Sequence, residues 1–154
     1  MNAEKSNKYR EATRSVINEV AKKQNIILIS WKDYWKLNKE DKEKYLEKYN
    51  AVMKAAKPKI AEVEKTVDQV DVSDFVDHID YLVEKIGINH VGISSDFDGG
   101  GGVKGWNDAS ETLNVTMELV KRGYTEAQIE KLWGMNLLRV LDEVHKVAKE
   151  LQGV

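Results

Sequence analysis

The sequence predicts an α/β fold that is mostly helical and contains about two short parallel strands. Residues 26–29 form an apolar run rich in β-branched side chains. A run without alternation is typical of a strand that is buried on both faces, as in a parallel sheet. Residues 90–93 are the second strand candidate. Amphipathic segments flank both, so helix and strand alternate, which favours parallel strands joined by right-handed crossovers.

The first part of the chain, residues 1–31, is predicted to contain one helix followed by the first strand. Its apolar residues recur at helical spacing between Tyr9 and Ala21. Residues 32–72 differ from this pattern, because a densely charged segment follows an aromatic patch there. We expect this region to be a helical insertion between a strand and its following helix.

Two residues set the expected limits of the helix inside this insertion. Asn38 can cap its N-terminus, because the side-chain oxygen can accept a hydrogen bond from a backbone N–H of the first turn. Pro58, the only proline in the sequence, is expected to end or kink the helix, since it has no N–H to donate. A second helical stretch containing Val63 and Val67 is predicted to follow.

Residues 73–154 are predicted to be mainly helical around the second strand, with Ser73 as the N-cap of their first helix. Glycines and one capping threonine mark the limits of the expected helices: Gly87, Gly123, Thr125 and Gly134. The three parts are expected to form one domain spanning residues 1–154.

Composition excludes several classes of function. The net charge is −2, and the 24 basic and 26 acidic residues are interspersed, so no basic patch suggests nucleic acid. Cysteine is absent, which excludes disulfides, thiolate metal sites and cysteine nucleophiles. No apolar run approaches the roughly 20 residues of a membrane span. Residues 1–14 are polar and lack a signal-peptide core, so a cytoplasmic location is expected unless a signal lies upstream.

The residues most suited to chemistry follow the second strand candidate, where Asp96 and Asp98 lead into the glycine run 99–102. In parallel α/β folds, ligands bind beyond the carboxyl ends of strands. Glycines without a Cβ allow a ligand to approach the backbone closely, so Gly99 and Gly100 are candidate substrate-binding residues. The same pattern also fits an acidic, glycine-rich turn that only closes a strand, and position alone leaves both interpretations open.

Two other patterns are weaker. Residues 100–105 spell G-x-G-x-x-G, as in a dinucleotide-binding loop. However, Asp96 and Asp98 precede them and would repel phosphate, and the next helix begins too late to point its N-terminus at a pyrophosphate. His78 and Asp80 reproduce the H-x-D spelling of a metal site. On a helix, residues two apart point roughly 200° apart, so these two could not chelate one ion.

Several segments of the second half occur in the order found in one enzyme family. Residues 72–81 read V-S-D-F-V-D-H-I-D-Y and residues 90–99 read H-V-G-I-S-S-D-F-D-G. Residues 122–126 read R-G-Y-T-E and residues 133–140 read W-G-M-N-L-L-R-V. They resemble the V-x-D-V-V-D-H-I-D-H, H-V-G-I-G-S-D-F-D-G, R-G-Y-S-E-E and W-G-G-N-L-L-R-V segments of the renal (membrane) dipeptidases, peptidase family M19.

The resemblance implies a TIM-like (β/α)₈ barrel that hydrolyses dipeptides with a pair of zinc ions. In that family the metal ligands are an H-x-D on the first strand, a bridging glutamate and two later histidines, all upstream of these four segments. Asp96 matches the active-site aspartate that ends the eighth strand. This residue is thought to exchange a proton with the metal-bridging water and to pass it to the leaving amine, a role suited to a carboxylate.

The chain departs from the family in length and in ligands. A full barrel needs about 250 residues, so this chain is expected to be a C-terminal portion that carries the seventh and eighth strands. No strand-borne H-x-D is present, and Ser94 and Met135 stand where the family usually has glycine. Zinc is therefore expected in the complete family enzyme, whereas this chain alone is expected to bind none.

Two hypotheses about function remain open at this stage. The chain is either part of a metallo-dipeptidase that another polypeptide segment completes, or a non-catalytic remnant with an interaction role. Because two parallel strands without neighbours expose unpaired edges, self-association or association with the missing half of the barrel is expected. A dipeptide substrate is expected for the completed enzyme, with neither nucleic acid nor a membrane as a partner.

Overall fold

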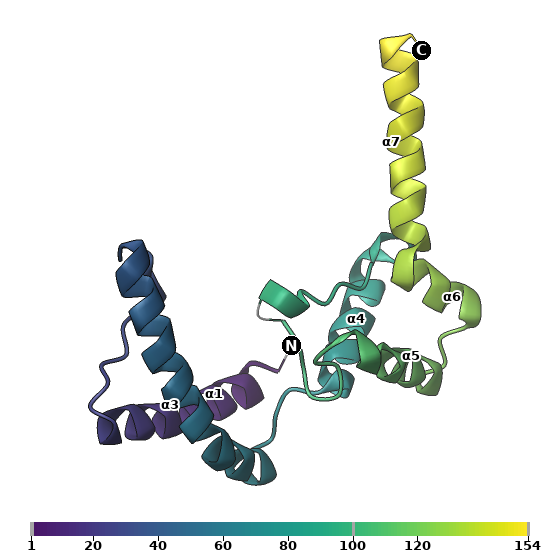
Figure 1. Cartoon of the computed structure of the whole chain (residues 1–154). Helices are drawn as coiled ribbons and strands as arrows, with labels where there is room; N and C mark the ends of the chain where they lie inside the picture. Colours follow the sequence, from purple (N-terminus) through teal and green to yellow (C-terminus); the bar gives the residue numbers. More distant parts are fainter. Residues whose placement is uncertain (1, 100, 154) are drawn as a thin grey trace. The chain divides into compact units, whose positions relative to one another are not determined.

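The computed structural model describes residues 2–99 and 101–153, and the chain divides into two compact units, Asn2–Gln69 and Val70–Val154. Figure 1 shows that both units are built from helices. The first unit contains α1 (Ala3–Lys23), α2 (Trp31–Tyr34) and α3 (Lys39–Thr66). The second contains α4 (Val72–Ile86), α5 (Thr112–Lys121), α6 (Glu126–Glu130) and α7 (Asn136–Gln152). It also contains the short 3-10 helices η1 (Ile88–His90), η2 (Phe97–Gly99) and η3 (Ala109–Glu111), and a π-helix, η4 (Lys131–Met135).

The first unit is held together by α1 packing against α3. Their buried residues form one apolar cluster: Val20, Ala21, Val52 and Ala56. Two polar contacts join the same pair of helices, since Tyr9 Oη donates to Glu64 at 2.9 Å and Lys59 Nζ lies 2.9 Å from Glu19. The stripe predicted between Tyr9 and Ala21 is therefore the packed face of α1.

The helix predicted after Asn38 is confirmed, and of the two outcomes predicted at Pro58, an end or a kink, the end is wrong. Asn38 is the N-cap of α3 and accepts a hydrogen bond from the Asp41 N–H at 2.9 Å. The helix runs through Pro58 without ending there, so the two predicted helical stretches are one. Apolar residues on both sides of the proline, Ala56 and Ile60, pack in the same cluster, and this shared packing compensates for the missing N–H.

The core of the second unit lies where α4 and α5 face one another. Its buried residues come from five segments: Val76, Ile79, Val91, Trp106, Val115, Leu119 and Leu132. The N-cap of α4 is Asp71 and not Ser73 as predicted. Asp71 accepts from the Asp74 N–H while Asp74 accepts from the Asp71 N–H, so this reciprocal pair satisfies two donors that Ser73 could not. The capping box predicted at Thr125 is confirmed, and Gly87 ends α4 with a φ of 84°.

The two predicted parallel strands are not formed within residues 2–99 and 101–153. Residues 26–29 belong to the first unit and residues 91–93 to the second, and neither segment forms a strand. Residue Val91 is extended, and the Ile93 N–H donates to the Leu132 carbonyl at 2.9 Å instead of to a neighbouring strand. A strand needs an adjacent backbone to pair with, and these segments have none in the part of the chain described. The fold class is thus mostly helical, and the single domain predicted for residues 1–154 stays a prediction.

No helix within the described residues is long and apolar enough to cross a membrane.

Candidate active site

Asp96 lies at the end of an extended segment that leads out of the core of the second unit. The segment begins at buried Val91 and has no regular secondary structure up to Asp96. Asp96 itself has a φ of 55°, a left-handed conformation that is uncommon outside glycine, asparagine and aspartate. Its carbonyl accepts hydrogen bonds from the N–H groups of Gly99 and Gly101, at 3.1 and 2.8 Å. The chain therefore turns sharply at Asp96, and the side chain of Asp96 is exposed.

The turn is anchored to the core by an aromatic cluster. Phe97, directly after Asp96, lies edge-on to Trp106 with ring centroids 5.3 Å apart. Trp106 is buried and also contacts Phe75 of α4 at 5.0 Å and Trp133 at 6.0 Å. The local sequence therefore combines a residue that packs against the core with glycines that lead away from it, and this combination fixes where the Asp96 turn lies.

The glycines after Asp96 are required because the turn leaves no space for a Cβ at Gly99 or Gly101. A Cβ on Gly99 would collide with the Asp96 carboxylate, whose Cγ lies 2.7 Å from the position of that Cβ. A Cβ on Gly101 would collide with the backbone carbonyls of Ser95 and Asp96. The loop thus folds closely over Asp96, and Gly99 borders its carboxylate. The other candidate substrate-binding residue, Gly100, lies outside the described residues, as does the side chain of Asp98.

The remaining titratable residues singled out in the sequence do not converge on Asp96. His78 is exposed on α4, and the helix separates it from Asp80, so the predicted failure of this pair to chelate a metal follows from the observed helix. His90 lies in η1, before the extended segment, and His145 lies in α7. Within the described residues, no group of three or more His, Asp or Glu side chains is arranged to hold a metal ion.

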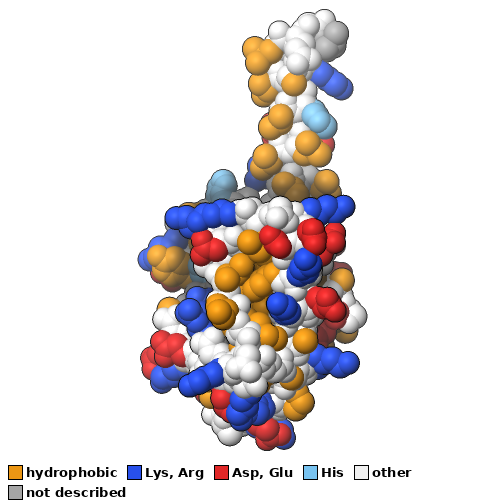
Figure 2. Space-filling model, turned by 60° about the vertical axis from the view of Figure 1, so that its left-hand side comes forward, with side chains coloured by type: hydrophobic (Ala, Val, Ile, Leu, Met, Phe, Trp, Pro, Cys, Tyr) orange, Lys and Arg blue, Asp and Glu red, His pale blue; other side chains and the backbone are white. Residues whose placement is uncertain are grey.

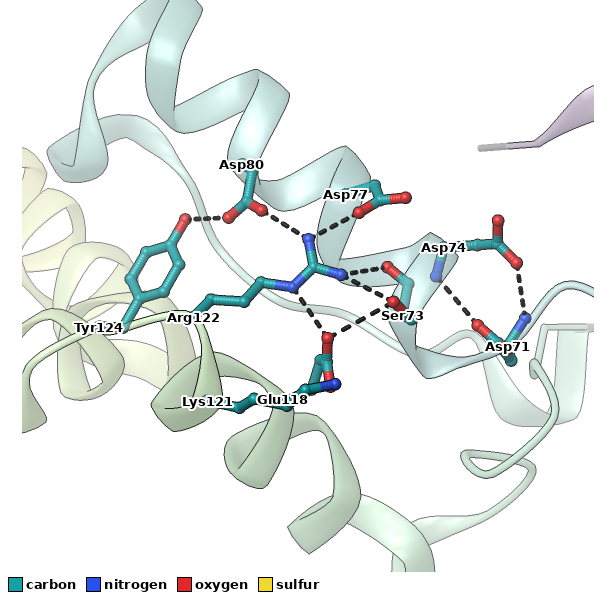
Figure 3. A network of polar contacts seen from close by, with 9 residues as sticks. All are labelled: Asp71, Ser73, Asp74, Asp77, Asp80, Glu118, Lys121, Arg122 and Tyr124. Atoms are coloured by element: carbon teal, nitrogen blue, oxygen red, sulfur yellow. Dashed lines mark hydrogen bonds and ion pairs between the residues drawn. The ribbon is translucent and has the colours of Figure 1, made fainter.

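A network of charged residues that sequence reasoning missed joins α4 to α5 (Figure 3). At its centre, Arg122 Nη1 lies 2.6 Å from both Asp77 and Asp80, while Nε donates to Glu118 at 2.9 Å. Nη2 donates to the carbonyl and to the hydroxyl of Ser73, at 2.8 and 2.9 Å. All five donors of a guanidinium lie in one plane, so a single arginine can bind several acceptors on two helices at once.

The contacts of the network shift the pKa values of Arg122, Glu118 and Tyr124. Burial opposes the charge of Arg122, but hydrogen bonds to Asp80, Asp77 and Glu118 outweigh it and raise the pKa of the guanidinium. The hydrogen bond from Arg122 lowers the pKa of Glu118. Burial, together with a 2.6 Å hydrogen bond to Asp80, raises the pKa of Tyr124 to about 12. The network is a structural clamp, because its cation and its carboxylates are already paired with one another.

Comparison with known proteins identifies the fold to which these motifs belong. A family model described as membrane dipeptidase, peptidase family M19, matches residues 5–154. The chain belongs to the membrane dipeptidase family. The resemblance predicted from the motifs is thereby confirmed.

Individual dipeptidases are similar over about half of the chain. Dipeptidase tcpJ of Claviceps purpurea is 38% identical over 91 residues, which cover 58% of this chain and 21% of that protein. Dipeptidase ataJ of Aspergillus terreus is 48% identical over 77 residues, covering 49% of this chain and 19% of that protein. Both matches leave about four fifths of each relative without a counterpart in this chain.

A solved structure of the family shares the fold of the chain. The probable dipeptidase PvdM from Pseudomonas aeruginosa is 36% identical, with a TM-score of 0.52 over 88% of this chain and 34% of that chain. Within the dipeptidase family, the H-V-G-I-G-S-D-F-D-G segment corresponds here to residues 90–99, which form the extended segment and the Asp96 turn. The family motif is thus the part of the molecule that holds this carboxylate in place.

Proposed function

We propose that this chain contributes Asp96 to a dipeptidase active site, as the carboxylate that transfers a proton during hydrolysis. The observation that carries the proposal is the left-handed backbone of Asp96 at the end of an extended segment. Strained backbone conformations at non-glycine residues cluster at functional sites, where surrounding structure maintains them. Here the two hydrogen bonds to the Asp96 carbonyl and the Phe97 anchor supply that support.

The proposed chemistry suits an exposed carboxylate in a fixed position. Peptide hydrolysis requires one group to accept a proton from the attacking water and to deliver a proton to the leaving amine. One carboxylate can perform both steps in turn, first as a base and then as an acid. Because Gly99 has no side chain, the Asp96 carboxylate can lie against the backbone of the loop without a collision. Asp96 is exposed, so a small substrate such as a dipeptide could reach it.

The proposed enzyme depends on zinc, but the described residues do not fit a zinc site, since they contain no suitable group of ligands. We therefore propose that the metal-binding residues come from polypeptide outside the described residues, and that this chain alone does not hydrolyse dipeptides. The coverage of about one fifth of the fungal dipeptidases supports this proposal.

The first experiment uses the purified chain alone. It is incubated with zinc and a hydrophobic dipeptide, and both released amino acids and protein-bound zinc are measured. We expect neither turnover nor stoichiometric metal. Zinc-dependent turnover by this chain would refute the proposed incompleteness.

The second experiment tests Asp96 in a chimera, in which the part of PvdM outside the matched region precedes residues 5–154 of this chain. We expect Asp96→Asn to lower turnover by roughly 10² to 10⁴-fold with unchanged zinc content, because a proton-transfer group is worth about that much. The control is Asp142→Asn, which changes an exposed carboxylate of α7 and should leave turnover unchanged. Loss of zinc in Asp96→Asn would assign this residue as a metal ligand instead.

A second candidate function is that of a non-catalytic interaction domain, which the exposed apolar residues of α7 favour. A folded, zinc-loaded chimera without turnover would support this alternative over catalysis. The cytoplasmic location expected from the sequence stays a prediction that cell fractionation can test.

A further inference from the structure

A cavity of about 560 Å³ opens between the 3-10 helix η1 and the helical segment that runs from η4 into α7. It belongs wholly to the second unit, and its lining consists of Asn89, His90, Lys131, Met135, Asn136 and Arg139. Two of these side chains are cations and one is an imidazole, whereas none of the described residues that line the space is acidic. We call this space the basic cavity.

A single uncharged residue holds both cations of the basic cavity. Lys131 Nζ donates to Asn89 Oδ1 at 2.9 Å, and Arg139 Nη2 donates to the Asn89 carbonyl at 2.8 Å. These two oxygens orient the donors but bring no negative charge. Within the described residues, neither cation forms an ion pair with a carboxylate. Two positive charges that the protein itself does not neutralise are therefore held next to Asn89.

The Arg122 clamp shows, by contrast, how the same unit neutralises an arginine. Arg122 lies within 2.9 Å of Asp77, Asp80 and Glu118, so it has no charge to offer a ligand. Arg139 makes its hydrogen bond to a neutral carbonyl, and most of its five N–H donors have no acceptor among the described residues. Two like charges that are held together repel one another, and an anion bound between them removes this repulsion.

The backbone around the basic cavity is fixed by contacts within the chain. Asn136 Nδ2 donates to the carbonyls of Ile88 and Val91, at 2.7 and 2.8 Å, and so ties η1 to the start of α7. The π-helix η4 is kinked at Gly134, where the backbone departs from helical angles (φ 177°, ψ −27°). Single π-helical turns occur frequently at functional sites. The kink lies between the two cations in the sequence, so it determines how both approach the same residue.

We propose that the basic cavity binds a small phosphate monoester, with the phosphate group between Lys131 and Arg139. A guanidinium fork matches two oxygens of a phosphate, and an ammonium adds a compact charge. Two cations balance a dianion, whereas a carboxylate would leave one of them uncompensated. The volume suits a small molecule, since ligand pockets typically measure about 300–1,000 Å³, and Met135 provides an apolar wall for the rest of the ligand. This site goes beyond the proposed function, because Asp96 takes no part in it.

The charge of the whole chain argues against a nucleic acid or an anionic membrane as the source of the phosphate. The net charge is −2. On the face of the molecule drawn in Figure 2, acidic side chains are interspersed with basic ones, so an extended polyanion would meet carboxylates as well as cations. Binding to nucleic acids or to anionic lipids relies on clusters of lysine and arginine. Two cations inside a cavity instead fit one phosphate group on a small molecule.

The experiment titrates the purified chain with glycerol 3-phosphate and follows binding by calorimetry and by NMR of the backbone amides. We expect a Kd of about 1 mM or below, since two charge-assisted hydrogen bonds hold one anion, with the largest amide shifts at residues 88–90 and 131–139. Lys131→Gln should weaken binding at least about tenfold, because it removes one of the two cations. The matched control is Lys146→Gln, which removes an exposed cation of α7 outside the cavity and should bind like the wild type.

A second variant keeps the test decisive if circular dichroism shows that Lys131→Gln has lost helix content. His90→Gln leaves both contacts to Asn89 in place. It should weaken binding about threefold, because it removes an imidazole that lines the cavity and can donate a hydrogen bond to the phosphate.

Several results would overturn the proposal. They are the absence of saturable binding, equal affinities of Lys131→Gln and Lys146→Gln, and amide shifts that lie outside the basic cavity. Acetate that binds as tightly as glycerol 3-phosphate at equal ionic strength would also overturn it, as would binding to phosphatidic acid vesicles without binding to glycerol 3-phosphate. Asp96→Asn should bind glycerol 3-phosphate normally, so separate variants distinguish a failure of this site from a failure of the proposed catalysis.

Discussion

Arg122→Ala should destabilise the second unit by about 3–5 kcal/mol, because it removes the cation that joins α4 to α5. The Glu118 side chain is only 14% exposed, and the loss of a charged hydrogen bond from such a site costs about 1.5–3 kcal/mol. The ion pair with Asp80, which is 40% exposed, is reduced by solvent to about 0.5–1 kcal/mol, and that with Asp77, at 66%, to almost nothing. The hydrogen bonds to Ser73 add about 1 kcal/mol.

Hydrogen exchange of the α4 and α5 amides is the suitable assay. The chain contains two compact units, so a single global unfolding curve need not describe the second unit. Arg122→Lys should recover about half of the loss, since lysine keeps the charge but cannot bind both helices with a planar fork. The control is Lys121→Ala, whose ion pair with Glu118 is 74% exposed on the lysine side and is worth about 0.5 kcal/mol or less.

The ion pair between Arg122 and Glu118 also predicts that the stability of the second unit depends on pH. The hydrogen bond from Arg122 lowers the pKa of Glu118. The stabilisation that ionised Glu118 contributes is therefore fully present above the ordinary pKa of glutamate and is lost as the pH falls below about 4. In Arg122→Ala, the free energy of unfolding should therefore depend less on pH in this acidic range. Two results would refute the clamp. One is a loss of stability in Arg122→Ala no larger than that in Lys121→Ala, and the other is an unchanged dependence of stability on acidic pH in Arg122→Ala.

Three further predictions concern single residues. Tyr124 should ionise with a pKa of about 12 in an ultraviolet titration. Because this pKa is raised, the stabilisation from protonated Tyr124 should be lost as the pH rises from about 10 towards that value. Ionisation of Tyr124 near pH 10 would contradict its burial. Asn136→Ala should cost about 2–3 kcal/mol, measured by hydrogen exchange of the α4 and α5 amides, because two backbone carbonyls lose a buried donor. Gly99→Ala should abolish the protection of the amides bonded to the Asp96 carbonyl in NMR hydrogen exchange, while Gly92→Ala, with nothing within 4 Å of its Cβ, should not.

Local signals allowed the helices to be predicted, and the lack of local signals explains the strands that were predicted wrongly. Asn38 and Thr125 cap helices through side chains three residues from their partners, so the sequence alone contains the whole interaction. A strand depends on a backbone elsewhere in the chain, and no property of residues 26–29 can supply it. The helix end predicted as one outcome at Pro58 failed for a similar reason, because packing of α3 against α1 decides whether the helix continues.

The candidate site also contains one part that could be predicted from the sequence and one part that could not. The Asp96 turn was predictable because the carboxylate and its glycines are contiguous in sequence. The Arg122 clamp was missed because its partners Asp77 and Ser73 lie 45 and 49 residues away. One signal was available, since Asp77 and Asp80 are three apart and therefore share one face of a helix, which is an arrangement that calls for a cation from a neighbouring element.

The family motifs in this chain act together to position one carboxylate. The segment 122–126 supplies the clamp that fixes α5 against α4, and these two helices contribute more than half of the buried core residues. The segment 133–140 supplies Asn136, whose side chain binds the Val91 carbonyl at the start of the extended segment, while the Ile93 N–H binds the Leu132 carbonyl. The departures from the family pattern fall outside these contacts, because Met135 is 54% exposed and Ser94 is exposed as well. Both replacements therefore leave intact the support that leads to Asp96, which is the residue on which the proposed chemistry depends.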